Sequence, residues 1–135
     1  MTDDHADIEA VVATFFAAFT SGPDLDARLD QLRTVLLPEA VVTRTCGQPA
    51  TYDVEGFIEP RRELLSSERL TDFREWEVEG TTQVWGDVAQ RWSRYAKAWV
   101  ESGTAATGSG TKSIQLVRTD DGWRISAVAW DDERP

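Results

Sequence analysis

The sequence predicts one α+β domain over residues 1–135, in which three N-terminal helices pack against a mostly antiparallel sheet. Apolar residues recur at helical spacing through most of the first 65 residues, whereas from residue 70 onward apolar and polar residues alternate at period two. An Asp-Gly dipeptide near the C-terminal end is typical of a hairpin turn. A chain of 135 residues buries roughly two-thirds of its unfolded surface and needs no disulfide or structural metal.

Two helices are predicted at the start of the chain. The first has apolar residues spaced by three or four positions, which are Ile8, Val12, Phe15 and Phe19. Its acidic start suits the positive end of the helix dipole, and Gly22 followed by Pro23 ends it. The second helix follows at once, with leucines at positions 25, 29, 32 and 36, and Pro38 stops it. Together they predict a two-helix hairpin.

A short strand and a third helix follow. Residues 40–46 form a β-branched run that ends at Gly47, which predicts a strand. Asp53 stands where it can cap a helix whose apolar side includes Phe57 and Ile58. Pro60 has no amide hydrogen, so it predicts a kink or a restart within this helix.

The remainder of the chain predicts strands. In residues 73–84, Trp76 and its apolar or basic neighbours alternate with Glu75, Glu77 and Glu79, and we interpret the glutamates as a solvated face. A metal site is not expected there, because carboxylates on a straight strand lie about 7 Å apart and do not converge. Residues 88–101 predict a long strand, and glycine and serine predict a flexible loop over residues 102–110.

The last hairpin pairs residues 112–120 with residues 123–131 around Asp121-Gly122. A two-residue turn there places Ser113 opposite Trp130 and Gln115 opposite Val128. The other face is almost wholly apolar, and we expect a dimer interface formed by Ile114, Leu116, Trp123 and Ile125. Because neither face suits water, the sequence predicts helices over one face and a second subunit over the other.

The composition argues against several kinds of partner. The formal net charge of −10 repels phosphate backbones and anionic membranes, so neither nucleic acid nor a membrane is an expected partner. No run of about 18 apolar residues and no basic leader is present, which predicts a cytoplasmic protein. Cys46 and His5 are single, so we expect no thiolate or imidazole metal site, no cofactor, and an inert thiol at Cys46.

The order of elements resembles the nuclear-transport-factor-2-like (NTF2-like), or SnoaL-like, α+β cone with a cystatin-like fold. Three segments carry this resemblance: the opening helix over residues 8–19, the stretch Leu-Leu-Pro-Glu-Ala-Val-Val over residues 36–42, and Asp-Gly-Trp-Arg-Ile over residues 121–125 with Trp130. The resemblance implies a strongly curved sheet that wraps helices around a conical pocket. It also implies a homodimer formed through the convex side of the sheet.

The family contains isomerases, cyclases, dehydratases, epoxide hydrolases and non-enzymes, so the fold alone decides no chemistry. In the isomerases, a tyrosine of the first helix and an aspartate of the first strand act on the substrate. The corresponding positions here hold Phe15 and Arg44, and an arginine cannot act as a general base near neutral pH. Dehydratase-like members use a histidine, but His5 lies at the start of the first helix. The comparison therefore argues against isomerase chemistry.

The predicted ligand pocket combines the first helix, the first strand and the sheet. Its residues are Phe15, Phe19, Arg44, Trp76, Ser113, Gln115, Val128 and Trp130. Arg44 would clamp an anion or else pair with an internal carboxylate, and Tyr95 would donate to an oxyanion or else bond a backbone carbonyl. These two are the only catalytic candidates.

Three functions remain open on the sequence. The first is binding of a small hydrophobic or aromatic molecule, anionic ones included, in an apolar pocket. The second is a SnoaL-like isomerase, cyclase or lyase that acts on a hydrophobic carbonyl compound, with Arg44 and Tyr95 in the site. The third is a non-catalytic protein-interaction domain whose cavity is filled by side chains.

Overall fold

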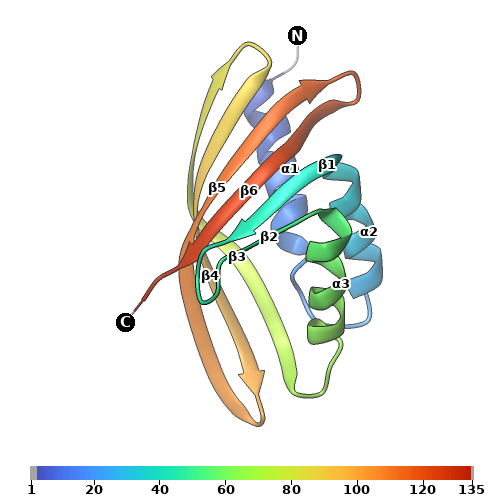
Figure 1. Ribbon diagram of the computed structural model, residues 1–135, viewed down its shortest axis with the longest axis vertical. Helices are drawn as coiled ribbons and strands as arrows, with labels where there is room; N and C mark the ends of the chain where they lie inside the picture. The colour runs from blue at the N-terminus through green and yellow to red at the C-terminus, as the bar shows by residue number, and fades with distance from the viewer. Residues whose placement is uncertain (1–2, 135) are drawn as a thin grey trace.

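The computed structural model describes residues 3–134 and contains three helices and six strands in those residues. In chain order they are α1 (Asp4–Ala17), α2 (Leu25–Val35), β1 (Leu36–Arg44), β2 (Ala50–Tyr52), α3 (Val54–Leu65), β3 (Leu70–Trp85), β4 (Val88–Glu101), β5 (Thr104–Thr119) and β6 (Gly122–Asp132). The three helices cover one face of a curved sheet, and the other face carries no helix (Figure 1). The predicted fold class is confirmed.

The sheet has the order β2-β1-β6-β5-β4-β3. All neighbouring strands are antiparallel except β1 and β6, which are parallel. A parallel pair needs a long connection, and here residues 45–121, more than half of the chain, separate the two strands. The N-terminal β1 thus extends the sheet that the C-terminal hairpins build, and it brings the helices over its inner face.

Local signals fix the helix starts. The Asp3 side chain accepts a hydrogen bond from the Ala6 amide at the start of α1, and the Asp53 side chain accepts one from the Gly56 amide at the start of α3. The α3 helix runs through Pro60 without an interruption, so the predicted restart is wrong. The second helix ends at Val35, and β1 begins four residues earlier than predicted.

The predicted flexible loop over residues 102–110 is also wrong. Only Ser102 and Gly103, both with positive φ angles, form the turn, and β5 begins at Thr104. Two glycines in this segment allow larger side chains to cross it. A Cβ at Gly108 would lie 2.8 Å from Cε of Lys97, and a Cβ at Gly110 would overlap the Tyr95 hydroxyl. Glycine here permits close approach within the sheet rather than flexibility.

The last hairpin is displaced from its predicted register. Thr119 pairs with Gly122, so the turn consists of Asp120 and Asp121, and a bulge follows at Ser126 of β6, opposite Gln115 and Leu116. Ser113 consequently lies opposite Ala129 instead of Trp130. The partner of Trp130 across the ladder is Lys112.

This register places the predicted dimer interface inside the molecule. Its four residues are 0–2% exposed and form the core beneath the helices, and they are Ile114, Leu116, Trp123 and Ile125. The apolar character of this face was recognised correctly, but the helices cover it. Among the described residues, no helix is long and apolar enough to cross a membrane.

The phase of β3 is opposite to the prediction. Glu75 and Glu77 face the helices, with side chains only 8% and 18% exposed, while Trp76 between them faces outward and is 40% exposed. The carboxylates turn inward because two buried cations, Lys112 and Arg91, bind them. An unpaired buried cation costs far more than an exposed tryptophan, so charge pairing decides which face of β3 is inside.

We expect Ile114→Ala to lower the free energy of unfolding by about 2–5 kcal/mol, because the substitution leaves a cavity in the core. Gln115→Ala, one residue away on the outer face, should change it by less than about 0.5 kcal/mol. Urea unfolding of both variants measures the difference. Equal stability of the two would contradict the assignment of Ile114 to the inner face and Gln115 to the outer face.

Candidate functional site

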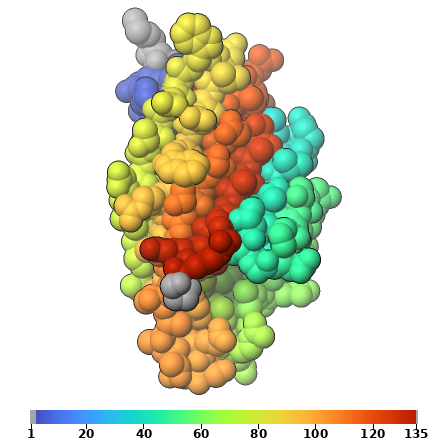
Figure 2. Space-filling model, turned by 60° about the vertical axis from the view of Figure 1, so that its left-hand side comes forward, coloured from blue at the N-terminus to red at the C-terminus, as the bar shows by residue number. Residues whose placement is uncertain are grey.

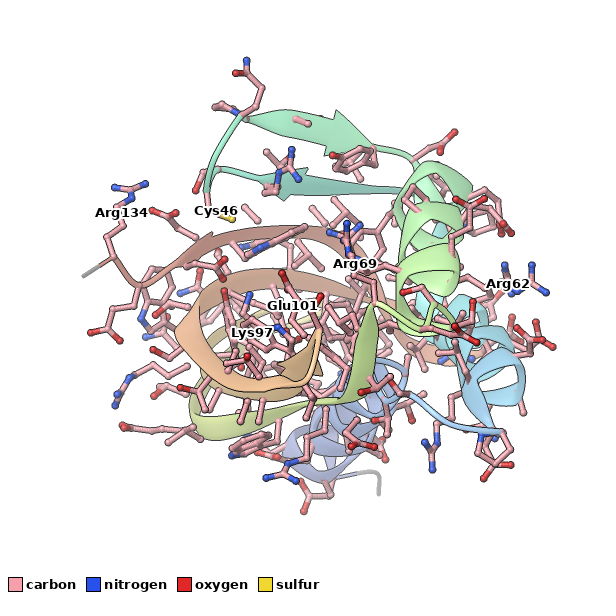
Figure 3. All side chains as sticks on the ribbon, turned by 90° about the horizontal axis from the view of Figure 1, so that it is seen from below. Cys46, Arg62, Arg69, Lys97, Glu101 and Arg134 are labelled. Atoms are coloured by element: carbon pink, nitrogen blue, oxygen red, sulfur yellow. The ribbon has the colours of Figure 1, made fainter. Side chains whose placement is uncertain are left out.

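A cavity of about 360 Å³ lies between α3 and the inner face of the sheet. Its aromatic lining consists of Phe19, Tyr52, Phe57, Phe73, Trp99 and Trp130. Its charged lining consists of Arg44, Arg61, Glu75, Lys97, Glu101 and Lys112. Seen from below, the strands curl around the labelled Lys97 and Glu101 (Figure 3). A cavity with aromatic walls and a few charged groups is the usual form of a small-molecule site.

The aromatic wall is continuous from Phe19, just after α1, to Trp130 of β6. The Phe19 and Phe57 rings meet edge to face with their centroids 5.8 Å apart, and the Phe57 and Trp130 rings meet at the same distance. On the opposite side, Phe73 lies 5.9 Å from Trp99. These contacts hold the rings in fixed orientations, so the wall is formed before any ligand binds.

Arg61 projects from α3 over this wall. Its guanidinium lies 4.0 Å above the centre of the Phe57 ring and 5.2 Å from that of Trp130, and its Nη1 donates to the Phe57 carbonyl. Burial lowers the pKa of Arg61 from its ordinary value, although the group stays charged at neutral pH. Within residues 3–134, no carboxylate lies within salt-bridge distance of it.

Arg44 approaches the same cavity from the end of β1, where it is aligned with Trp130 of β6. Its Nη2 and Nε donate to the Gln48 carbonyl at 2.9 and 3.3 Å. In the described part of the chain it, too, forms no salt bridge. Two guanidinium groups without a carboxylate partner therefore line one cavity.

Lys112 lies deep in the cavity. Its Nζ is 3.5 Å from Oε2 of Glu75, and both side chains are less than a tenth exposed. The centres of the Tyr95 and Trp130 rings lie 4.3 and 4.9 Å from Nζ. Burial lowers the pKa of Lys112, and Glu75 opposes that shift only in part.

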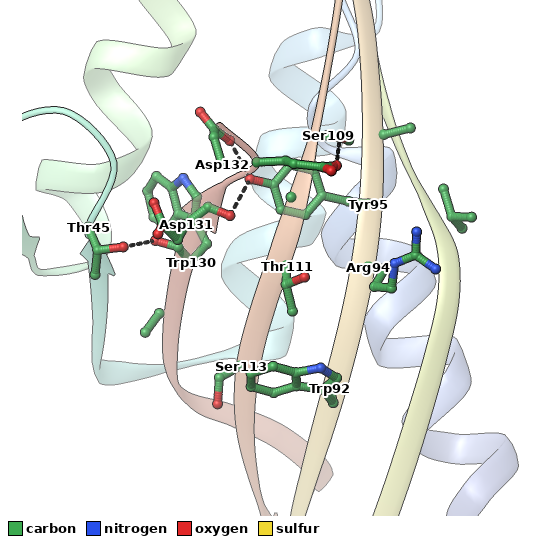
Figure 4. A pocket seen from close by; sticks show the side chains of 15 residues that line it. Thr45, Trp92, Arg94, Tyr95, Ser109, Thr111, Ser113, Trp130, Asp131 and Asp132 are labelled. Atoms are coloured by element: carbon green, nitrogen blue, oxygen red, sulfur yellow. Dashed lines mark hydrogen bonds between the residues drawn. The ribbon is translucent and has the colours of Figure 1, made fainter. Parts of the chain in front are cut away.

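Tyr95, Lys97 and Asp132 form a second polar cluster beside the first. The Tyr95 hydroxyl donates to Asp132, whose two oxygens lie 3.1 and 3.2 Å from Nζ of Lys97. Burial and the bond to Asp132 raise the pKa of Tyr95. Burial alone would raise the pKa of Asp132, but the bonds from Tyr95 and Lys97 lower it. Figure 4 shows Tyr95 and Asp132 pointing toward one another.

Solved structures of other proteins identify the fold, whereas comparisons of sequence find no relative. No family model and no curated protein matches the sequence. An NTF2-like superfamily protein from Salmonella enterica superposes with a TM-score of 0.79 at 12% identity, over 96% of this chain and 91% of that one. An NTF2-like protein with a cystatin-like fold from Novosphingobium aromaticivorans has a TM-score of 0.73 at 19% identity, over 96% and 81% of the two chains.

The chain has an NTF2-like fold. A type 2 hexachlorocyclohexane dehydrochlorinase also superposes, with a TM-score of 0.76 at 11% identity over 96% of this chain and 85% of that one. Solved structures with this fold thus include an enzyme. Identities this low establish the architecture and leave the chemistry to the residues of the site.

The cavity between α3 and the sheet, called the inner cavity below, contains three of the eight predicted pocket residues, namely Phe19, Arg44 and Trp130. Phe15 and Val128 are buried in the core and do not line it. The other three need correction, because Trp76, Ser113 and Gln115 lie on the outer face of the sheet. Trp76 is on the outer face because Glu75 and Glu77 on either side of it turn inward. Ser113 and Gln115 are on the outer face because the hairpin pairs in a register that differs from the predicted one and places Lys112, not Ser113, opposite Trp130.

The catalytic candidate Tyr95 is placed differently from the prediction. It is 1% exposed, and its hydroxyl bonds the Asp132 carboxylate and lies 3.4 Å from the Asp131 carbonyl, so it is directed away from the cavity. The hydroxyl proton of Tyr95 is therefore already donated to Asp132. The predicted alternative of a packed ring with a hydroxyl bonded to nearby groups describes this geometry better.

Sequence reasoning missed Arg61 and Lys112, although both left a signal. Arg61 follows Phe57 by four residues and so belongs to the apolar face of α3. Lys112 precedes Ile114 and Leu116 at period two, which places it on the apolar face of β5. A charged residue in phase with an apolar face indicates either a buried pair or a site.

The outer face of the sheet has its own hollow of about 630 Å³, which is open to solvent (Figure 4). Trp92 and Val78 line it and are 60% and 55% exposed. Side chains of β3 to β6 reach the surface here with no helix over them (Figure 2). Tyr95 and Trp130 also line this hollow, which is more open than the inner cavity.

Glu75→Gln should lower the stability of the protein by about 3–5 kcal/mol at neutral pH, because it leaves Lys112 buried without a carboxylate. The pKa of Lys112 lies below its ordinary value of 10.5, so between these two values the unfolded chain binds more protons and stability rises with pH. Removal of Glu75 lowers the pKa of Lys112 further, so the pH range over which stability rises with pH extends to lower pH. The variant should therefore regain stability as pH rises from about 7 to 10, as measured by urea unfolding.

The double variant Glu75→Gln with Lys112→Met removes both charges and serves as the control. It should recover most of the lost stability, since an apolar replacement of a buried pair is often neutral. A double variant as unstable as Glu75→Gln alone would show that the unpaired cation is not the cause.

Proposed function

We propose that the inner cavity binds a small aromatic molecule that carries a carboxylate or a similar anionic group. The observation that carries this proposal is the pair of arginines on the cavity wall, Arg44 and Arg61, for which the described residues provide no carboxylate partner. Desolvating a guanidinium is costly unless an anion meets it, and its planar fork suits a carboxylate. An anionic ligand would supply the missing partner.

The walls support an aromatic ligand body. Phe19 after α1 and rings from α3 and β6 form one side of the cavity, and rings from β3 and β4 form the other. A flat ring between such walls gains edge and face contacts that an aliphatic chain does not. A volume of about 360 Å³ lies at the lower end of ordinary ligand sites, which favours one or two fused rings.

Binding is favoured over the two alternative functions. Isomerase, cyclase or lyase chemistry with Tyr95 as donor is disfavoured because Asp132 holds the Tyr95 hydroxyl. An interaction domain with a filled cavity is disfavoured because the space beside Trp130 and Trp99 is empty of side chains.

We also propose a homodimer through the outer face of the sheet. Trp76, Val78 and Trp92 expose large apolar surfaces there, more than isolated surface residues require. Arg94 and Asp131 flank the hollow from β4 and β6, and each forms an ion pair within the chain, with Glu79 and Arg134 respectively. A two-fold interface brings the same patch of both subunits together, so this apolar face would pack against its own copy. These residues replace the core residues that the sequence predicted for the interface.

Arg61→Gln should weaken binding of 2-naphthoate by roughly 10- to 100-fold, because a charged hydrogen bond is lost. Quenching of tryptophan fluorescence measures the affinity, since Trp99 and Trp130 line the cavity. Arg62→Gln is the matched control, because Arg62 is one residue away on α3 and pairs with Asp26 outside the cavity. Equal binding of 2-naphthalenemethanol, which has no charge, would contradict the anion proposal.

Trp92→Asp should convert a dimer at micromolar concentration into a monomer, because it places a charge in the apolar interface. Sedimentation velocity measures the change. Trp85→Asp is the control, since Trp85 is 85% exposed at the end of β3 and does not line the hollow. A wild-type protein that sediments as a monomer would refute the proposed interface.

A further inference from the structure

The two lysines of this chain have an unusual distribution. Of its 14 basic residues, only Lys97 and Lys112 are lysines, and both line the inner cavity. All the other basic positions, on the surface and in ion pairs, are arginines. The two side chains differ in chemistry, because a buried lysine can lose its proton and become a nucleophile, whereas arginine stays protonated. The cavity is therefore where this chain places its side-chain amines.

Charged groups from several elements surround Lys112. On β3 is Glu75, on β4 are Lys97 and Tyr95, on α3 is Arg61, and on β6 Asp132 bonds Tyr95 and Lys97. The α1 helix contributes only the rings of Phe15 and Phe16, at 5.8 and 5.9 Å from Nζ. Desolvation and the charges of Lys97 and Arg61 favour the neutral amine, and Glu75 favours the ammonium. Burial prevails, and the pKa of Lys112 falls.

We propose that Lys112 forms an imine with the carbonyl group of an anionic aromatic aldehyde or ketone bound in the cavity. This proposal rests on the proposed function, because Arg44 and Arg61 would bind the anionic group while the carbonyl reaches the buried amine. A lysine desolvated among apolar side chains and close to a second cation is the usual form of a nucleophilic amine.

The reaction balances without any further reagent. Glu75 accepts a proton from the Lys112 ammonium, and the neutral amine attacks the carbonyl carbon, which forms a C–N bond and a carbinolamine. The C–O bond then breaks, and the oxygen leaves as water with two of the three ammonium protons. The product is a protonated imine that keeps the third proton and the single positive charge. Glu75, 3.5 Å from Nζ, is placed to carry the proton between nitrogen and oxygen.

Lys97 is a poor nucleophile by comparison. Both oxygens of Asp132 lie within 3.2 Å of its Nζ, and its side chain is 20% exposed. Two hydrogen bonds to one carboxylate hold this nitrogen beside Asp132. Lys97 therefore serves as the neighbouring cation, and Lys112 as the reacting amine.

The test uses 4-formylbenzoate with sodium cyanoborohydride, which reduces an imine to a stable secondary amine. We expect one adduct per chain, and peptide mass spectrometry should place it on the peptide that contains Lys112. At pH 7 the rate should exceed that of Nα-acetyl-lysine, because a lowered pKa raises the fraction of neutral amine. Lys97→Arg should keep the adduct, and Lys112→Arg should lose it while it retains a cation for Glu75.

The unreactive analogue 4-methylbenzoate separates the imine proposal from the binding proposal. If this analogue binds and no adduct forms at Lys112, the imine is refuted and the binding function stands. If the analogue does not bind and no adduct forms, both fail. An adduct at Lys97 or at another amine, with Lys112 unmodified, also overturns the proposal. Because the wild-type peptide map identifies the site directly, the conclusion does not depend on any variant folding.

Discussion

Pairing of buried cations with carboxylates from β3 is the interaction on which the rest of this structure depends. Arg91 on β4 donates to Glu77, to Glu9 of α1 and to Thr82, and it is 4% exposed. Beside it, Lys112 meets Glu75. Buried charges are tolerated only when they are paired and hydrogen-bonded, so both glutamates must face inward. The position of one strand then determines the surfaces on both sides of the sheet.

On the outer side, that constraint exposes tryptophan. Because β3 places Glu75 and Glu77 inside, the alternating residues Trp76 and Val78 must be outside, and the bulge between Glu77 and Glu79 leaves Glu79 exposed as well. Trp92 of β4 lies on the same face. The apolar outer surface is thus a consequence of the polar interior, and it is the surface we assign to the dimer. Inside, the same pairing keeps an amine in an otherwise aromatic cavity.

The sequence predicted most helices and strands correctly, but not which side chains of the strands point toward the helices. Helical spacing, the Asp53 cap and the strand over Val88–Glu101 depend on local interactions, and the structure contains them. The phase of β3 depends instead on Lys112, a residue 37 positions along the chain from Glu75, and no local pattern reveals that pairing. The hairpin failed for a related reason: a turn displaced by one residue and one bulge move Ser113 away from Trp130.

The candidate site was harder to predict because its residues come from segments with different local patterns. Arg44 lies at the end of a β-branched strand, Arg61 lies on a helix after a proline, and Lys112 begins the strand that was predicted to follow a loop. Their convergence is created by the parallel pairing of β1 with β6 and by the position of α3 over that pair. The arrangement separates two kinds of cation. Permanently charged guanidiniums are held by carbonyls and aromatic faces, where an anion can still reach them. The amine that can lose its proton is held deeper, beside the one carboxylate able to exchange that proton with it.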